Sequence, residues 1–117
     1  MRGGWPAIIT SSRVNPTIPT DYHETGAWLL SFSRSHAKRE DSRIEALLES
    51  GGAREGRAYG LRLSLANRVE PPPGSPPIEL EFREVAEGRT RFAWCAALGE
   101  RLQTVARALL GGAQKAG

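Results

Sequence analysis

The chain has 117 residues, of which 39% are hydrophobic and 25% are charged, a composition typical of a soluble protein. Domains usually hold about 100–150 residues, so we expect one core and no second domain. Sixteen Lys and Arg residues against thirteen Asp and Glu give a formal charge of +3. The only cysteine, Cys95, excludes an internal disulfide and a cysteine-based metal cage. No apolar run is long enough for a membrane span, and the N-terminus lacks the apolar core of a signal peptide, so we expect a cytoplasmic protein.

Arginine supplies fourteen of the sixteen basic residues. Its planar guanidinium binds phosphates and carboxylates through two parallel hydrogen bonds. The bias has two interpretations: a GC-rich or heat-adapted genome, or a role in RNA contact or subunit docking. The arginines are scattered along the chain, so their pattern does not decide between these interpretations.

Residues 1–25 are expected to form an extension or an edge element, because Pro6, Pro16 and Pro19 interrupt any regular pairing. Within it, only residues 7–10 have the composition of a short strand. We expect a single α+β domain over residues 26–112 and a frayed tail over 113–117.

Alternation of large apolar side chains predicts a strand over Ala27–Phe32. A helix is predicted over Ser35–Glu49, because Ile44, Leu47 and Leu48 have helical spacing and a glycine pair follows.

Two further strands are predicted, at residues 59–65 and 78–83, since apolar and polar residues alternate in both. The proline-rich segment 70–77 between them is expected to be a stiff hairpin loop; the alternative is a docking ligand for an aromatic groove. Arg62 is expected to face Glu79 or Glu81 across the hairpin.

Residues 90–110 are predicted to form a long helix capped by Thr90, because apolar residues recur at three- and four-residue steps. The alternative is a fourth strand over residues 91–97, with the helix beginning at Gly99. The fold class is therefore α+β in the order β-α-β-β-α. It has a three-stranded, or with the alternative four-stranded, mixed sheet and two helices on one face. The first two strands would be parallel and the third would lie between them.

No catalytic constellation is visible, so we expect neither an enzyme nor a bound metal or cofactor. His23 and His36 lie in different segments, and no phosphate-loop or HExxH pattern is present. Cys95, between Trp94 and Ala96, has the surroundings of a small core residue rather than of a nucleophile.

One local segment, residues 21–29, resembles the Asp-x-Ser-x-x-Gly motif of PilZ domains. His23 replaces the motif serine, and the paired arginines of that family are absent upstream. The resemblance implies a degenerate nucleotide-sensing module for cyclic di-GMP. On the other interpretation, residues 21–26 are the turn that leads into the first strand.

From Trp28 to Leu110 the order of predicted elements resembles the small Pcc-type subunit of the KEOPS complex, which makes threonylcarbamoyladenosine on transfer RNA. Leu30-Ser31-Phe32 would end the first strand, residues 78–82 would form the last strand, and residues 91–100 would begin the C-terminal helix. Gln103-Thr104-Val105 and Ala108-Leu109 continue the pattern of that helix.

The resemblance implies a non-catalytic homodimeric scaffold that docks onto an ATP-binding transferase subunit through its helices and helps to hold transfer RNA. Independently, the apolar stripe of the last helix is wider than packing on a sheet requires. We therefore predict a partner or dimer interface formed by Trp94, Leu98, Arg101, Leu102, Val105 and Leu109. The alternative is that the whole stripe is core within the subunit.

A stand-alone nucleic-acid-binding protein is the other hypothesis for function. Its phosphate contacts would be made by Arg54, Arg57, Arg62, Arg89 and Arg91.

Overall fold

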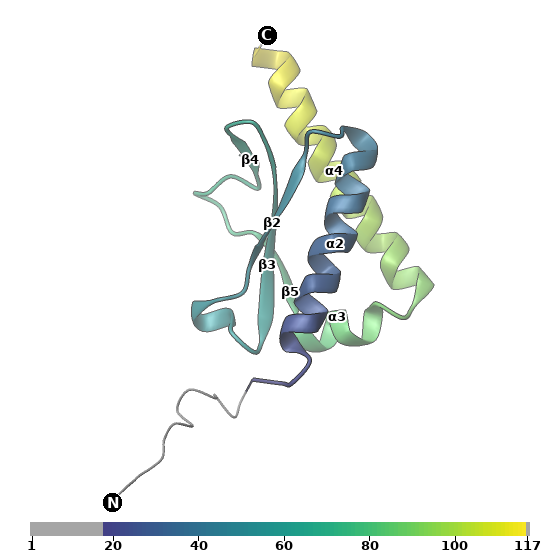
Figure 1. Ribbon diagram of the computed structural model, residues 1–117. Helices are drawn as coiled ribbons and strands as arrows, with labels where there is room; N and C mark the ends of the chain where they lie inside the picture. Colours follow the sequence, from purple (N-terminus) through teal and green to yellow (C-terminus); the bar gives the residue numbers. More distant parts are fainter. Residues whose placement is uncertain (1–17, 117) are drawn as a thin grey trace, which may run out of the picture.

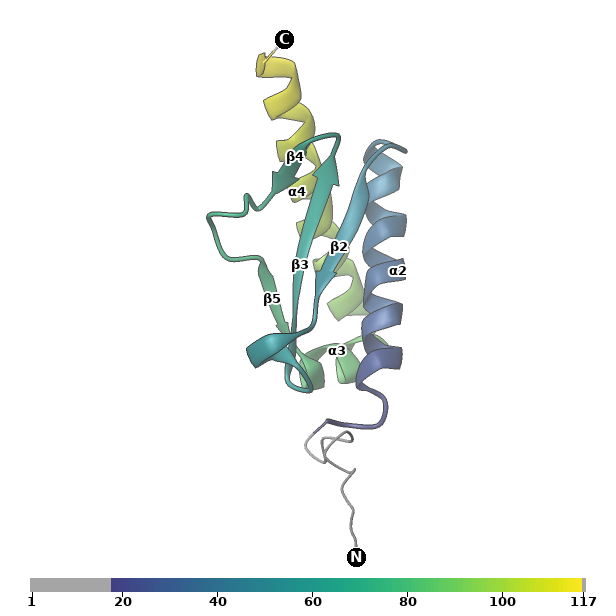
Figure 2. The same cartoon turned by 60° about the vertical axis from the view of Figure 1, so that its left-hand side comes forward.

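Two long helices cover one face of an antiparallel sheet in the computed structural model, which describes residues 18–116 (Figure 1). This arrangement confirms the α+β class, with both long helices on the same face of the sheet (Figure 2). Within the described residues, no helix is both long enough and apolar enough to cross a bilayer. The elements in chain order are α2 (Tyr22–Glu40), β2 (Glu45–Glu49), the 3-10 turn η2 (Gly52–Arg54), β3 (Ala58–Leu65), β4 (Arg68–Glu70), β5 (Ile78–Glu81), α3 (Phe82–Gly88) and α4 (Phe92–Ala116).

The central strand of the sheet is β3. It pairs with β2 along one side, from Glu45 opposite Ser64 to Glu49 opposite Gly60. Along its other side it pairs first with β4 and then with β5. All of these pairings are antiparallel, so the predicted parallel pair and mixed sheet are wrong.

The proline-rich segment is an excursion from the edge of the sheet, not the turn of a hairpin. Leu63 pairs with Glu70 and Leu61 pairs with Ile78, so two steps along β3 correspond to eight along its partner. The hairpin turn itself is made by Ala66 and Asn67, between β3 and β4. Prolines cannot donate to a strand ladder, which explains why the chain leaves the sheet after β4 and pairs again at β5.

The strand predicted over Ala27–Phe32 is wrong, because these residues lie within helix α2. The face of α2 that packs on the sheet consists largely of small or polar residues, which do not look like core in a sequence. Gly26 lies so close to β3 that a Cβ there would be 2.9 Å from Cε1 of Tyr59. The alternating aromatic residues Trp28 and Phe32 are one helical turn apart and stack at 4.9 Å. The buried residues of α2 are Tyr22, Thr25, Gly26, Leu29, Ser33 and Ala37.

The helix predicted over Ser35–Glu49 is also wrong, since α2 ends at Glu40 and residues 45–49 form β2. Ile44 and Ala46 are buried and Leu48 packs against the core, whereas Leu47 is 40% exposed. This is the alternation of a strand with one face on the core, and it coincides over a few residues with helical spacing. The observed element order therefore differs from the predicted β-α-β-β-α.

The predicted strands at residues 59–65 and 78–83 are confirmed over Ala58–Leu65 and Ile78–Glu81. The long C-terminal helix is confirmed as α4, so the alternative strand over residues 91–97 is wrong. Thr90 does not cap α4; its hydroxyl donates to the carbonyl of Glu87, at the end of α3.

Helix α2 begins inside the segment that was expected to be an N-terminal extension. Tyr22 and Thr25, which lie in that segment, are fully buried. The strand expected at residues 7–10 lies outside the described residues. At the other end, α4 continues past residue 110, where the predicted helix ends, to Ala116.

Two stacked tyrosines join the first turn of α2 to the beginning of β3. The rings of Tyr22 and Tyr59 are nearly parallel, with centroids 4.7 Å apart, and both residues are fully buried. Tyr22 Oη lies 2.6 Å from the carbonyl oxygen of Ala58, and Tyr59 Oη donates to the carbonyl oxygen of Tyr22. Burial raises the pKa of the Tyr59 phenol, and the neighbouring Tyr22 raises it further. Burial also raises the pKa of Tyr22.

We expect this pair to make the protein sensitive to alkali. Unfolded tyrosines lose their protons near pH 10, whereas the folded pair retains them, so stability is complete below about pH 10 and falls as the pH rises above it. Tyr59→Phe should lower the free energy of unfolding at neutral pH by about 1 kcal/mol and flatten its decline in alkali. Urea unfolding at several pH values measures both effects, and identical alkaline slopes for the two proteins would contradict the assignment.

The turn between β3 and β4 contains a strained residue. Ala66 has φ of 57°, a conformation that a residue with a Cβ adopts at a cost and glycine adopts freely. Ala66→Gly should therefore raise the free energy of unfolding by about 1 kcal/mol. The same substitution at Ala97, inside helix α4, should lower it. Urea denaturation compares the two variants, and an Ala66→Gly protein no more stable than the parent would contradict the prediction.

Candidate functional site

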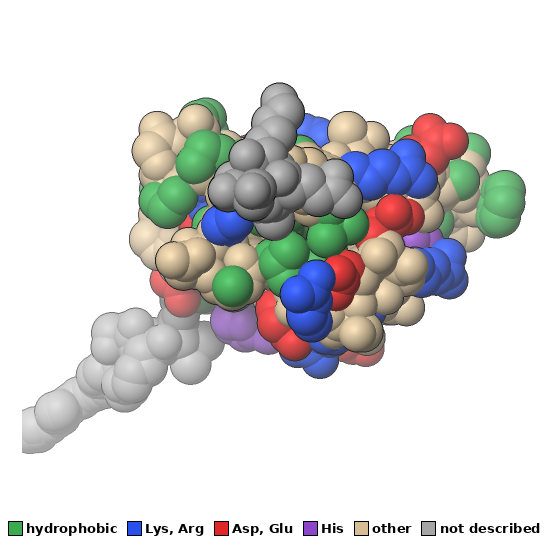
Figure 3. Space-filling model, turned by 90° about the horizontal axis from the view of Figure 1, so that it is seen from above, with side chains coloured by type: hydrophobic (Ala, Val, Ile, Leu, Met, Phe, Trp, Pro, Cys, Tyr) green, Lys and Arg blue, Asp and Glu red, His purple; other side chains and the backbone are tan. Residues whose placement is uncertain are grey.

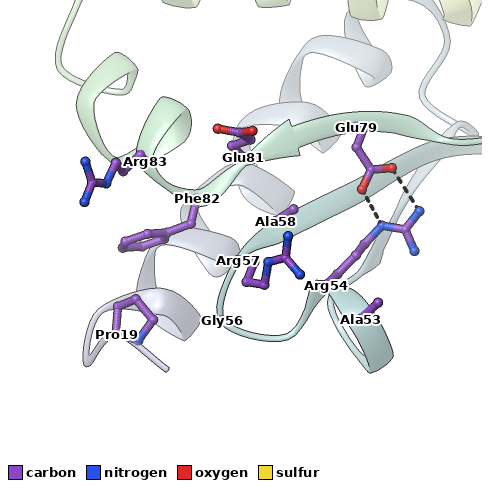
Figure 4. Close-up of a pocket in the computed structure, with 10 residues that line it drawn as sticks. All are labelled: Pro19, Ala53, Arg54, Gly56, Arg57, Ala58, Glu79, Glu81, Phe82 and Arg83. Carbon is purple, nitrogen blue, oxygen red and sulfur yellow. Dashed lines mark hydrogen bonds and ion pairs between the residues drawn. The ribbon is translucent and has the colours of Figure 1, made fainter. Parts of the chain in front are cut away.

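A polar groove lies at the end of the sheet where η2 and the turn after it meet the start of α3 (Figure 4). Its volume is about 730 Å³. We call it the sheet-end groove; it is lined by Pro19, Ala53, Arg54, Gly56, Arg57, Ala58, Glu79, Glu81, Phe82 and Arg83.

Arg54 forms a clasp across the sheet beside this groove. Strand register places Glu49 on one side of Gly60 and Glu79 on the other. Arg54 donates two hydrogen bonds of 2.9 Å to Glu79, and its Nη1 lies 3.4 Å from Glu49. A Cβ at Gly60 would be 2.9 Å from Arg54 Nε and 2.8 Å from Cγ of Pro77, so glycine leaves room for the crossing side chain. The guanidinium of Arg54 is thus engaged by two carboxylates of the sheet.

Arg62 also forms an ion pair with Glu49. Its predicted pairing with Glu79 or Glu81 is therefore wrong. Its Nε donates to Glu49 at 2.7 Å, while its Nη1 donates to the carbonyl oxygens of Pro71 and Pro72. The arginine therefore ties the proline segment to the sheet. Because only 11% of its side chain is exposed, Arg62 has little surface to offer a ligand.

The three other arginines of the nucleic-acid hypothesis lie in two places. Arg57 is exposed and lines the sheet-end groove, whereas Arg89 and Arg91 lie between α3 and α4. None of the three forms an ion pair with another residue in the described part of the chain. At the opposite end of the molecule, which Figure 3 shows from above, basic and acidic side chains are interspersed. The predicted set of five arginines thus does not form one basic surface.

Sequence reasoning missed Phe82 and Arg83 as residues of the groove, because they were assigned to the end of a strand. Strand β5 runs directly into helix α3, which begins at Phe82. Glu81 accepts from the backbone N–H of Glu84, and the Glu84 side chain accepts from the N–H of Glu81. This reciprocal cap usually has Ser or Thr in the first position, so Glu81 is not a familiar signal for the start of a helix.

The predicted interface stripe on α4 is divided by the structure between core and surface. Leu98, Leu102 and Leu109 are buried in the core of the chain itself. Trp94 and Val105 are partly buried and pack against that core, while Arg101 is exposed. The alternative that the stripe is core therefore describes the three leucines, and only the flank of the stripe remains open.

A small hollow lies on that flank. Its volume is about 190 Å³. We call it the α4 hollow; it is lined by Leu80, Glu84, Trp94, Ala97, Leu98 and Arg101. Three of the six predicted interface residues thus surround one depression, together with Leu80 from β5 and Glu84 from α3.

Trp94 has a fixed position in this hollow. Its indole ring lies directly over Gly88, where a Cβ would collide with the ring. Its Nε1 lies 3.4 Å from a carboxylate oxygen of Glu84, and its ring is 6.3 Å from that of Trp28. The tryptophan therefore forms a rigid wall between α3 and α4.

Groups that often carry catalysis are arranged as packing residues. Cys95 Sγ lies 3.6 Å and 3.7 Å from the carbonyl oxygens of Gly88 and Arg89. The His36 ring packs 4.3 Å from that of Phe32 and against Gly99, and burial lowers the pKa of His36. In residues 18–116, no cluster of three or more His, Cys, Asp or Glu side chains is placed to hold a metal ion.

The segment that resembles a PilZ motif forms the beginning of helix α2, not a turn that leads into a strand. Asp21 precedes the helix, and Thr25 and Gly26 are buried residues within it. Comparisons of the chain with protein-family models, with curated proteins and with solved structures found no match.

Proposed function

We propose that this chain is a non-catalytic binding subunit that docks onto another protein through the α4 hollow. The observation that carries the proposal is the convergence of Trp94, Leu98 and Arg101 on one depression. Tryptophan and arginine at the centre of a pocket are the residues that most often dominate the free energy of protein association.

The chemistry of the hollow suits an apolar anchor from a partner. Its floor is made by Leu80 and Leu98, which are 3% and 5% exposed, and Ala97 leaves space above them. Arg101 and Glu84 are exposed charged residues among its lining. A partner side chain such as leucine would bury apolar surface there, while the two charges would fix its orientation.

The resemblance to Pcc-type subunits names the first partner to test. The resemblance rests on element order and spacing, and of its elements the strand at residues 78–81 and the long helix from residue 92 are both present. Leu30-Ser31-Phe32, which would end the first strand in that family, lies in α2. We therefore propose a KEOPS-like transferase subunit as the partner, with a role in transfer-RNA modification.

Ala97→Arg should abolish docking, because the new side chain would fill the hollow and place a charge on its apolar floor. Ala93→Arg is the matched control, since it adds the same residue to the same helix outside the lining of the hollow. Light scattering after gel filtration measures the mass of each variant with a purified KEOPS-type transferase subunit. We expect complexes with the parent chain and with Ala93→Arg, and at least about tenfold weaker binding with Ala97→Arg.

Equal binding by the two variants would contradict docking through the hollow. The same measurement on the chain alone tests the expected homodimer. A dimer that dissociates in Ala97→Arg and persists in Ala93→Arg would assign the hollow to a second copy of the chain.

A further inference from the structure

We propose that the sheet-end groove binds a nucleotide, with its base against Phe82 and its phosphate at Arg57 and Arg83. This site is distinct from the α4 hollow, since the two share no lining residue. Their functions can therefore be tested separately.

Arg57 and Arg83 are the two arginines of the groove that can bind a ligand's phosphate. Arg54 is directed to Glu79 and Glu49, as described above. The Glu81 carboxylate accepts a hydrogen bond from the backbone N–H of Glu84, in the first turn of α3. Arg57 and Arg83 are both exposed, and neither forms an ion pair among the residues described here. A guanidinium without a carboxylate partner, at the wall of a groove, is suited to bind phosphate through two parallel hydrogen bonds.

Phe82 supplies the aromatic part of the site. Figure 4 shows its ring on the same side of the groove as Arg83 and Pro19, with Arg57 on the other side of the Phe82 backbone. The ring is partly buried, lies 5.9 Å from that of Tyr22, and belongs to a residue whose N–H donates to the carbonyl of Arg57 at 2.8 Å. The backbone hydrogen bond and the tyrosine hold Phe82 in position. An aromatic ring held in position in a groove lined by cations is a stacking platform for a base.

The dimensions of the groove agree with such a ligand. A volume of about 730 Å³ lies within the range of roughly 300–1,000 Å³ that is usual for small-molecule sites. The same chemistry would recognise a free nucleotide or one unit of a single strand, and the choice between these sources is made by the test.

The test is the fluorescence anisotropy of a short, labelled oligouridine titrated with the full chain, with unlabelled adenosine monophosphate, uridine monophosphate and inorganic phosphate as competitors. Binding should weaken as salt rises, with a log–log slope of about −0.7 if the two arginines neutralise one phosphate. If the monophosphates displace the labelled oligomer at concentrations close to its own dissociation constant, the groove is a free-nucleotide site. Competition by the unlabelled oligomer alone would identify a strand site. Both results support the proposal, whereas phosphate competing as well as a nucleotide would overturn it.

Variants separate the groove from the rest of the surface. The double variant Arg57→Gln and Arg83→Gln should weaken binding by at least about tenfold. Phe82→Leu should weaken binding by about tenfold, because the base loses its stacking partner. Arg91→Gln is the control, since Arg91 is equally exposed but lies outside the groove, and it should leave binding unchanged.

Circular dichroism verifies that each variant is folded, and the two arginine substitutions are at exposed positions where folding does not depend on them. The proposal is overturned if the chain binds neither oligomer nor nucleotide. It is also overturned if the double arginine variant binds like the parent, or if Arg91→Gln loses as much affinity.

Discussion

The stacked pair of Tyr22 and Tyr59 is the constraint on which the geometry of the sheet-end groove depends. It places the first turn of α2 against the start of β3, where Gly26 allows the helix to approach the Tyr59 ring. The Tyr22 hydroxyl lies within 3.2 Å of the carbonyl oxygens of Ser50, Arg54 and Ala58. These carbonyls belong to the segment around η2, so one buried phenol holds the wall of the sheet-end groove in place. A phenol has one proton to donate, and the shortest contact, to Ala58, identifies the main acceptor.

The junction between β5 and α3 connects the two sites. Leu80 and Glu84 line the α4 hollow, while Phe82 and Arg83 line the sheet-end groove. The strand passes into the helix without a loop, and the reciprocal cap between Glu81 and Glu84 fixes the turn between them. A short rigid segment thus presents neighbouring residues to different surfaces. With both proposed ligands bound, this segment would fix their positions relative to each other.

Sequence patterns predicted the elements with long, regular runs of large buried side chains. They failed in α2, whose buried face is largely small or polar, and in β2, whose short alternation coincides with helical spacing. The strand β3 was predicted correctly from the alternation of Tyr59, Leu61, Leu63 and Leu65. The helix α4 was predicted correctly from its apolar stripe. In α2 the buried face includes Gly26 and Ser33, so the alternation of the partly buried Trp28 and Phe32 suggested a strand that is not there. Arg57 was predicted as a contact residue from its charge alone. Phe82 was not found, because its role arises from a helix start that an unusual cap conceals and from contacts with a tyrosine sixty residues away.

The central claim is that one chain carries two separate binding surfaces, one on each side of the β5–α3 junction. The most direct measurement is a map of backbone amide shifts in the ¹⁵N-labelled chain, recorded with saturating uridine monophosphate and then with the transferase subunit. We predict that the nucleotide shifts amides around residues 53–58 and 79–83 and that the partner shifts those around residues 94–101. Shifts from both ligands over one common surface, or nucleotide shifts confined to Arg89 and Arg91, would contradict the account.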